Sequence, residues 1–234
     1  MCGVIGISIK DVTEEDFSLI ENVFLQSMIR GKHATGVSYY NDNKIITIKE
    51  PVSVDKFLEN NSPNNWLNGT NIDCIGHIRY STSDLNYNQP IASDKLSISH
   101  NGIITQEDPE NWKDKFGYST TTRNDSELIL RCLENKDIVF KTFSGSSMAV
   151  CTLDYSGKIT FFRNGQRPLY YGHLYNIFGK VRGTIVASTK DILVRSGIKH
   201  IFNTEMQAEY SIHDDSTVYI KETYITNKKD LQCI

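Results

Sequence analysis

Residues 1–9 read Met-Cys-Gly-Val-Ile-Gly-Ile-Ser-Ile, an apolar run that begins at the second residue of the chain. From Cys2 to Ile9 the residues are largely β-branched and apolar, and glycine and serine interrupt them. Such a run is typical of a strand that is buried on both faces. Gly3 and Gly6 also leave space beside the backbone of this strand. We therefore expect a buried strand at the very start of the chain.

A helix is expected after this strand. Thr13 is a suitable N-cap, and acidic residues occupy positions 14–16, where they favour the positive end of a helix dipole. Gly31 is a natural stop. Apolar residues recur between these points at helical spacing, namely Phe17, Ile20, Phe24 and Met28.

Most of the remaining chain consists of strand-like runs separated by polar turns. Paired runs predict three hairpins, at Gly36–Tyr40 with Lys44–Lys49, Met148–Leu153 with Lys158–Phe162, and Glu209–Ile212 with Thr217–Lys221. Further strands are expected at Ile72–Tyr80, Leu96–His100, Leu169–Tyr171 and Thr184–Ser188, helices at Val54–Leu58, Asp125–Leu133 and Thr189–Ser196, and a surface loop at Asn60–Asn71. Hairpins make antiparallel sheets, so we expect an α+β fold with two mostly antiparallel sheets between helix layers.

The composition excludes several classes of protein. The chain has 234 residues and a formal net charge of -3, and no obvious basic patch favours nucleic-acid binding. No apolar run approaches the roughly 20 residues that a membrane span needs. The apolar start also lacks the basic lead-in of a signal peptide, so we expect a cytoplasmic protein with no membrane partner.

Metal and nucleotide sites are not indicated either. The five cysteines are widely spaced without a C-x-x-C pair, and the six histidines include no H-x-x-x-H pair. Neither G-x-G-x-x-G nor a P-loop sequence occurs. We therefore expect no metal and no cofactor.

Cys2 has the chemistry of a nucleophile if Met1 is removed. Methionine aminopeptidases remove Met1 when the second residue is small, and the chain would then start at Cys2. That residue would carry both a thiol and a free α-amine, whose reference pKa is about 7.7–8.0. Such an amine can accept the proton of the thiol beside it, so no separate histidine base is needed. Taken alone, Cys2 could equally be the first residue of a buried strand.

Other motifs lie along the chain in a recognisable order. Besides Cys2–Gly6 and Arg30–Gly36, they are Gly76–Thr82, Ser99–Gly102, Asn124–Leu128 and Arg163–Gly172. With these six segments the sequence resembles a class II glutamine amidotransferase domain, of the N-terminal-nucleophile (Ntn) hydrolase superfamily. The resemblance covers nearly the whole chain.

The resemblance implies a fold and an activity. The fold is the four-layer αββα sandwich of Ntn hydrolases, formed by residues 1–234 as a single type-2 amidotransferase domain. The activity is hydrolysis of the side-chain amide of glutamine to glutamate and ammonia, through a γ-glutamyl thioester on Cys2. The chain ends about where such a domain should, so we expect either a separate synthase subunit as the ammonia acceptor or a free-standing glutaminase.

Site residues follow from the same resemblance. Asn101 and Gly102 match the oxyanion hole, through a side-chain amide and a backbone N–H. Arg79 matches the group that binds the glutamine α-carboxylate, and Thr82 a position that hydrogen-bonds the same carboxylate. Asp125 matches the acceptor of the α-ammonium. Taken singly, these residues could be a turn, a surface cation and a helix cap.

Two more residues are placed in the substrate site. Arg30 is expected to line the site from a loop. His100 is expected to support it rather than act as a base.

Two other functions remain open on the sequence. An N-terminal-cysteine amidohydrolase could use Cys2 on a different amide, although Arg79 and Asp125 favour an amino-acid zwitterion. A binding or regulatory module could retain the fold without catalysis, and it would keep Met1 or carry a broken site.

Overall fold

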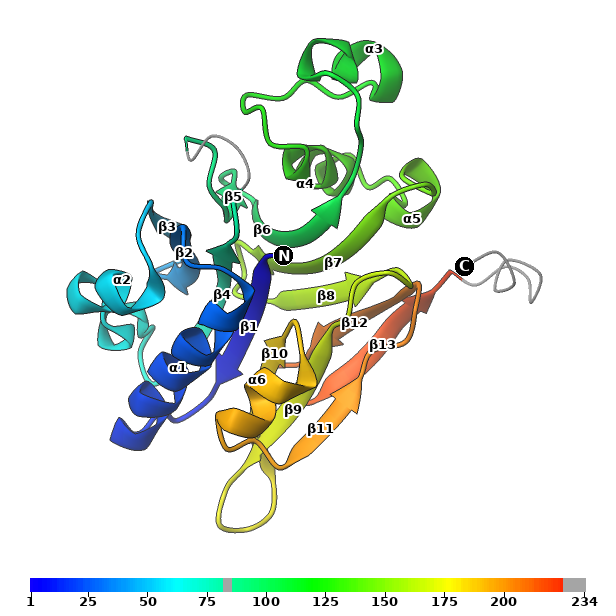
Figure 1. The fold of residues 1–234 in the computed structure, drawn as a ribbon. Helices are drawn as coiled ribbons and strands as arrows, with labels where there is room; N and C mark the ends of the chain where they lie inside the picture. Colours follow the sequence, from blue (N-terminus) through cyan, green and yellow to red (C-terminus); the bar gives the residue numbers. More distant parts are fainter. Residues whose placement is uncertain (82–85, 225–234) are drawn as a thin grey trace.

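The fold was analysed in a computed structural model that describes residues 1–81 and 86–224. Two antiparallel sheets form its centre (Figure 1). The larger sheet has the order β11 (His200–Asn203), β9 (Tyr170–Tyr175), β10 (Val181–Ala187), β1 (Gly3–Ile9), β4 (Ile72–Arg79), β2 (Ala34–Asn41), β3 (Lys44–Glu50). The second sheet has the order β13 (Val218–Thr223), β12 (Ala208–Ile212), β8 (Ile159–Arg163), β7 (Ser147–Asp154), β6 (Leu96–Ile103), β5 (Ile91–Ala92).

Helices cover the outer face of each sheet. Those against the larger sheet are α1 (Glu14–Gln26), the 3-10 turn η1 (Ser27–Arg30), α2 (Val54–Asn60), η2 (Pro63–Trp66) and α6 (Lys190–Arg195). Those on the side of the second sheet are η3 (Pro109–Asn111), α3 (Trp112–Phe116), α4 (Ser126–Glu134) and α5 (Val139–Thr142). The expected αββα sandwich is confirmed. None of the described helices is both long and apolar enough to cross a membrane.

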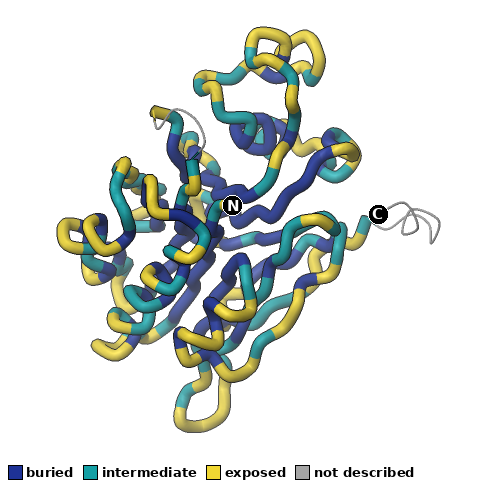
Figure 2. The backbone as a smooth tube through the Cα atoms, in the orientation of Figure 1, coloured by how far each residue is buried: buried dark blue, intermediate teal, exposed yellow. Residues whose placement is uncertain are grey.

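The alternation of side chains along β1 creates two of the three cores. Ile5, Ile7 and Ile9 face the helices α1, α2 and α6, whereas Val4 faces the second sheet. A third core lies between the second sheet and α4, around Leu128 and Met148. Figure 2 shows the resulting pattern of buried strands and exposed outer turns. All seven residues of β1 are buried, as the sequence predicts.

The expected N-terminal helix is present but shorter than predicted. Thr13 caps it, and the Asp16 carboxylate accepts the Thr13 backbone N–H at 2.8 Å. The α-helix ends at Gln26, and the chain tightens into the 3-10 turn η1 before Gly31. The Ser27 hydroxyl donates to the Val23 carbonyl at 2.7 Å at this change of geometry. The turn brings Arg30 to the start of β1.

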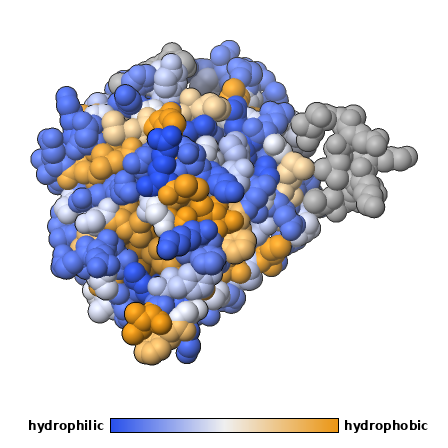
Figure 3. Space-filling model, turned by 60° about the horizontal axis from the view of Figure 1, so that its bottom comes forward, coloured by the Kyte–Doolittle hydropathy of each residue, from blue (hydrophilic) through white to orange (hydrophobic). Residues whose placement is uncertain are grey.

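Two expectations need correction, one for a loop and one for the length of two strands. The predicted loop Asn60–Asn71 contains η2, whose Trp66 is fully buried against the rings of Phe24 and Tyr39. The β9–β10 hairpin extends beyond the predicted strands and displays Ile177 and Phe178, which are 93% and 80% exposed. It lies at the Ile9 end of β1, because Ile9 pairs with Gly183 near the start of β10. Figure 3 brings this end of the molecule forward and shows separate apolar patches among polar side chains.

Candidate active site

The site forms where β1, β4 and β6 meet at the start of the chain. Gly3 pairs with Ile78 in β4, which places Cys2 beside the end of that strand. The backbone N–H of Cys2 donates to Oδ1 of Asn101 in β6 at 3.1 Å. The Cys2 Sγ lies 3.9 Å from the Tyr80 carbonyl oxygen. Cys2 therefore lies at the junction of the two sheets.

Burial separates Cys2 from the other described cysteines. Cys74 and Cys151 are fully buried, and burial raises the pKa of both thiols well above the ordinary value. Burial also raises the pKa of Cys132. These three thiols stay protonated and inaccessible, whereas Cys2 is partly exposed. Among the described cysteines, Cys2 alone can act on a substrate, and Cys233 lies outside the described residues.

Asn101 has a donor that no described residue uses. Its side chain is 3% exposed, and its Oδ1 accepts the Cys2 N–H. Its Nδ2 is buried and has no hydrogen-bond partner among the described residues. An unused buried donor costs about 1–3 kcal/mol, so such groups occur where an acceptor is to be bound. Because Oδ1 is turned toward Cys2, the Nδ2 group points away from the Cys2 nitrogen.

Gly102 follows in a conformation that suits glycine alone. Its φ is +155°, and a Cβ there would overlap the Ser147 carbonyl oxygen of the neighbouring strand β7. The same Cβ would lie 2.7 Å from Nε2 of His100. This close packing fixes the backbone next to Asn101.

We predict that Gly102→Ala lowers the free energy of unfolding by at least about 2 kcal/mol, because the new Cβ meets backbone that cannot move aside. Chemical denaturation measures the change. Gly145→Ala is the matched control, since a Cβ there meets nothing within 4 Å, and it should stay within about 0.5 kcal/mol of the wild type. Equal stabilities of the two variants would contradict the prediction.

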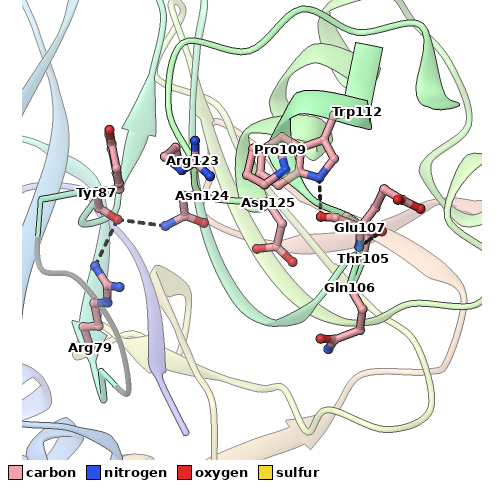
Figure 4. A pocket seen from close by; sticks show the side chains of 10 residues that line it. All are labelled: Arg79, Tyr87, Thr105, Gln106, Glu107, Pro109, Trp112, Arg123, Asn124 and Asp125. Atoms are coloured by element: carbon pink, nitrogen blue, oxygen red, sulfur yellow. Dashed lines mark hydrogen bonds between the residues drawn. The ribbon is translucent and has the colours of Figure 1, made fainter. Parts of the chain in front are cut away.

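A pocket of about 460 Å³ adjoins these residues. Arg79 enters it from the end of β4, and Asp125 enters it from the start of α4 (Figure 4). Arg79 Nη1 donates to the Tyr87 carbonyl at 3.1 Å and to Asn88 Oδ1 at 2.7 Å. The Asp125 carboxylate accepts the Ile104 backbone N–H at 2.7 Å. The pocket thus presents a guanidinium and a carboxylate on different walls.

The pocket is joined to Cys2 through two stretches of backbone. Arg79 is followed directly by Tyr80, whose carbonyl faces the Cys2 thiol. Ile104, which holds Asp125, comes two residues after Gly102. The structure therefore brings the predicted residues into two adjacent groups, with Cys2 at the junction and Arg79 and Asp125 in the pocket. Thr82 lies outside the described residues.

Glu127 orders the loop that carries Asp125. It is fully buried, and its carboxylate accepts the backbone N–H groups of Thr121 and Thr122 and pairs with Arg131 at 2.7 Å. Burial alone would raise the pKa of Glu127, but these hydrogen bonds hold it below the ordinary value. Glu127 therefore stays charged and fixes the pocket wall.

His100 lies behind the pocket rather than in its lining. It is 2% exposed, and its Nδ1 lies 2.8 Å from the Ser126 hydroxyl. Gln89 Nε2 donates to the same hydroxyl at 3.0 Å, and Gln89 Oε1 accepts the His100 backbone N–H at 2.6 Å. Burial lowers the pKa of His100, and burial lowers the pKa of His77 to about 3. Both imidazoles are neutral at physiological pH.

Two arginines lie next to Cys2. Arg30 Nε donates to the Cys2 carbonyl at 3.3 Å. Arg167, in the loop between β8 and β9, places Nη1 3.6 Å from the Met1 sulfur. Arg167 lies within the motif Arg163–Gly172, which by itself predicts no role for this residue. The spacing of residues in the motif does not indicate that Arg167 lies near Met1, because this contact depends on how β8 and β9 lie relative to β1.

Comparison with known proteins gives one family. Residues 77–195 match the family described as the glutamine amidotransferase domain. An amidophosphoribosyltransferase from Methanothermobacter thermautotrophicus is 32% identical over 149 residues, covering 58% of this chain and 30% of that protein.

Solved structures are similar in fold. A glutamine phosphoribosylpyrophosphate amidotransferase from B. subtilis, solved with ADP and GMP, has a TM-score of 0.74 at 19% identity and covers 96% of this chain and 50% of its own. A structure described as the allosteric regulatory enzyme of purine biosynthesis gives 0.71 at 19% identity, covering 96% and 49%. A glutamine aminotransferase class-II domain protein from silicibacter pomeroyi gives 0.57 at 10% identity, covering 94% and 99%. The chain therefore spans about half the length of the first two structures and 30% of the curated relative.

Proposed function

Because this chain belongs to the glutamine amidotransferase domain family, we propose that it hydrolyses the side-chain amide of glutamine with Cys2 as the nucleophile. One observation carries the proposal. The accessible thiol of Cys2 lies beside Asn101, whose buried Nδ2 has no partner among the described residues. A nucleophile next to an unused donor is the arrangement that attack on a carbonyl carbon requires. The proposal treats residues 1–234 as one domain.

The reaction begins once Met1 is removed. The Cys2 nitrogen then becomes a free amine, which can keep its hydrogen bond to Asn101 Oδ1 and accept the thiol proton. The sulfur forms a bond to the amide carbon, and the carbonyl oxygen takes the negative charge. Asn101 Nδ2 and the backbone N–H of Gly102 are proposed to stabilise that oxyanion. The carbon–nitrogen bond then breaks, and the amine returns the proton to the departing ammonia.

The second half of the reaction releases glutamate. A γ-glutamyl thioester remains on Cys2 after ammonia leaves. Water attacks the thioester carbon and gives a proton to the amine. The carbon–sulfur bond then breaks, and the amine returns this proton to the sulfur, so that the thiol is restored. The same two groups therefore serve both halves, and the thiol and amine return to their starting state.

Glutamine itself is proposed to bind through its α-carbon charges. The Arg79 guanidinium suits a carboxylate, and the Asp125 carboxylate suits an ammonium. Both groups line the 460 Å³ pocket, and the carbonyl of Tyr80, which follows Arg79, lies 3.9 Å from the Cys2 Sγ. Arg30 borders the nucleophile, and His100 supports the wall through Ser126.

A separate protein is the proposed acceptor of the ammonia. Ammonia that reaches water becomes ammonium, which is not a nucleophile. The ammonia must therefore reach its acceptor without exposure to water. Three exposed apolar side chains directly neighbour Arg30, Arg79 and Gly102 along the chain, with exposed fractions of 66% for Ile29, 53% for Tyr80 and 43% for Ile103. Such exposed side chains fit a docking partner with an apolar face.

Intact mass and a panel of amides test the proposed function. We expect the mass to show loss of Met1 and the purified protein to release glutamate from glutamine. Glutaramate lacks the α-amine and 4-aminobutanamide lacks the α-carboxylate, so each should lose at least about 100-fold in kcat/KM through an unpaired charge in the pocket. Similar turnover of simple acyl amides would instead indicate an amidohydrolase for another substrate. Retained Met1 without turnover would indicate a binding module.

A further inference from the structure

Arg30 and Arg167 bring two positive charges to the nucleophile, and neither forms an ion pair with a described carboxylate. The Nε of Arg30 donates a hydrogen bond to the Cys2 carbonyl at 3.3 Å. Its Nη2 is buried without a hydrogen-bond partner among the described residues. The Nε of Arg167 donates a hydrogen bond to the Ser147 hydroxyl at 3.2 Å. Its Nη1 lies 3.6 Å from the sulfur of Met1, the residue that directly precedes Cys2.

The other ionisable groups around Cys2 do not neutralise this charge. His77 on β4 and His100 on β6 are buried and neutral. Arg79 adds a further positive charge, and it faces the pocket, where it bonds Tyr87 and Asn88. Asp125 is a carboxylate in the pocket wall, and it accepts the Ile104 N–H. The surroundings of Cys2 are therefore net positive.

Cys2 and Arg167 both act electrostatically on Arg30. Burial lowers the pKa of Arg30 from its ordinary value, a charged Cys2 would raise it, and Arg167 lowers it. Arg30 is thus close enough to Cys2 and to Arg167 for their charges to act on it. An α-amine has an ordinary pKa of about 7.7–8.0, so at neutral pH most of it is protonated and cannot accept a proton. A neighbouring cation disfavours the protonated form.

We propose that Arg167, together with Arg30, keeps the Cys2 α-amine unprotonated near neutral pH, so that it can accept the thiol proton. Arg167 is a positioning residue in this scheme, because it acts through the amine and does not contact the reacting carbon. The inference rests on the proposed function in one respect, the removal of Met1. That removal also frees Nη1 of Arg167 from the Met1 sulfur.

A titration of the N-terminus tests the inference without relying on turnover. Protein labelled with [3-13C]cysteine gives a Cys2 signal that is identified by its loss in Cys2→Ala, and its shift follows the coupled amine and thiol. In Arg167→Gln, which keeps a donor for Ser147, we expect the lower titration midpoint to rise by about 0.5–1 pH unit. Arg167→Lys keeps the charge and should stay within about 0.2 unit.

Arg195→Met is the control for lost net charge, because Arg195 lies on α6, is 60% exposed and pairs with Asp191. It should leave the midpoint unchanged. Arg167→Met serves if the glutamine variant fails to fold. An unmoved midpoint in both neutral variants would overturn the inference. So would an equal shift in Arg167→Lys, or an intact mass that retains Met1.

Activity separates this inference from the proposed function. The acidic limb of kcat/KM for glutamate release should shift upward with the titration midpoint in Arg167→Gln. A shifted midpoint in a protein that does not hydrolyse glutamine would support the role of Arg167 and contradict the proposed function. Glutamate release with an unmoved midpoint and an unmoved acidic limb would overturn the role of Arg167 and leave the proposed function standing.

Discussion

Cys2→Ala should abolish glutamate release, with a fall of at least about 10⁴-fold in kcat, because no other described thiol is accessible to a substrate. Alanine is small enough for Met1 to be removed, so the variant keeps the α-amine and loses the thiol alone. The fold should be unaffected, since the Cys2 side chain is partly exposed and its Sγ lies 3.9 Å from the Tyr80 carbonyl, a long hydrogen bond. Glutamate release and thermal unfolding measure the two effects.

Cys74→Ala is the matched control for this result. Cys74 is fully buried in β4, and burial raises the pKa of its thiol, so it cannot react with glutamine at neutral pH. Its replacement should leave kcat within about twofold. Residual activity within tenfold of the wild type in Cys2→Ala would contradict the assignment of the nucleophile.

Asn101→Ala should lower kcat by about 10²–10³-fold with little change in KM, because it removes a donor that is used once the oxyanion forms. The expectation rests on the buried Nδ2, which has no partner among the described residues. Steady-state kinetics on glutamine measure the two constants. A rise in KM with unchanged kcat would show instead that Asn101 binds the ground state.

Asn101→Asp separates the two functions of this side chain. Aspartate keeps an oxygen for the Cys2 nitrogen, now bonded at 3.1 Å, but has no N–H to donate. Its loss of kcat should be at least as large as that of the alanine variant. Wild-type turnover by Asn101→Asp would exclude the donor role. Asn111→Ala, an exposed amide that donates to Glu107, should not change kcat.

Much of the fold follows from local sequence patterns. The apolar run from Cys2 to Ile9 predicts β1, and polar turns between alternating runs predict three hairpins that the structure contains. The position of β1 between β4 and β10 does not follow from any local pattern, because Ile5 pairs with Ala187 far along the chain. The short helices α3 and α5 were also not predicted, since a single turn or two carries too few periodic positions.

The sequence names candidate residues for the site but does not predict their contacts. The motif resemblance indicated Cys2 and Asn101 together, and the structure joins them through one hydrogen bond across 99 residues of sequence separation. The pocket walls come from loops whose shape depends on tertiary bonds, such as those of Glu127. Arg167 shows the limit most clearly, because only the packing of the β8–β9 loop against Met1 reveals it.

The strand β1, which begins directly after Cys2, also allows the stability of the protein to be monitored. β1 is buried throughout and hydrogen-bonded along both edges, to β10 and to β4. Its amide hydrogens therefore exchange with solvent only when the sheet itself opens, which approaches global unfolding. Exchange at Ile5 and Ile7 reports the integrity of the whole protein, while the reactivity of Cys2 at the end of the same strand reports the site. A substitution or a bound acceptor therefore acts locally when it changes the reactivity of Cys2 but not the exchange at Ile5 and Ile7.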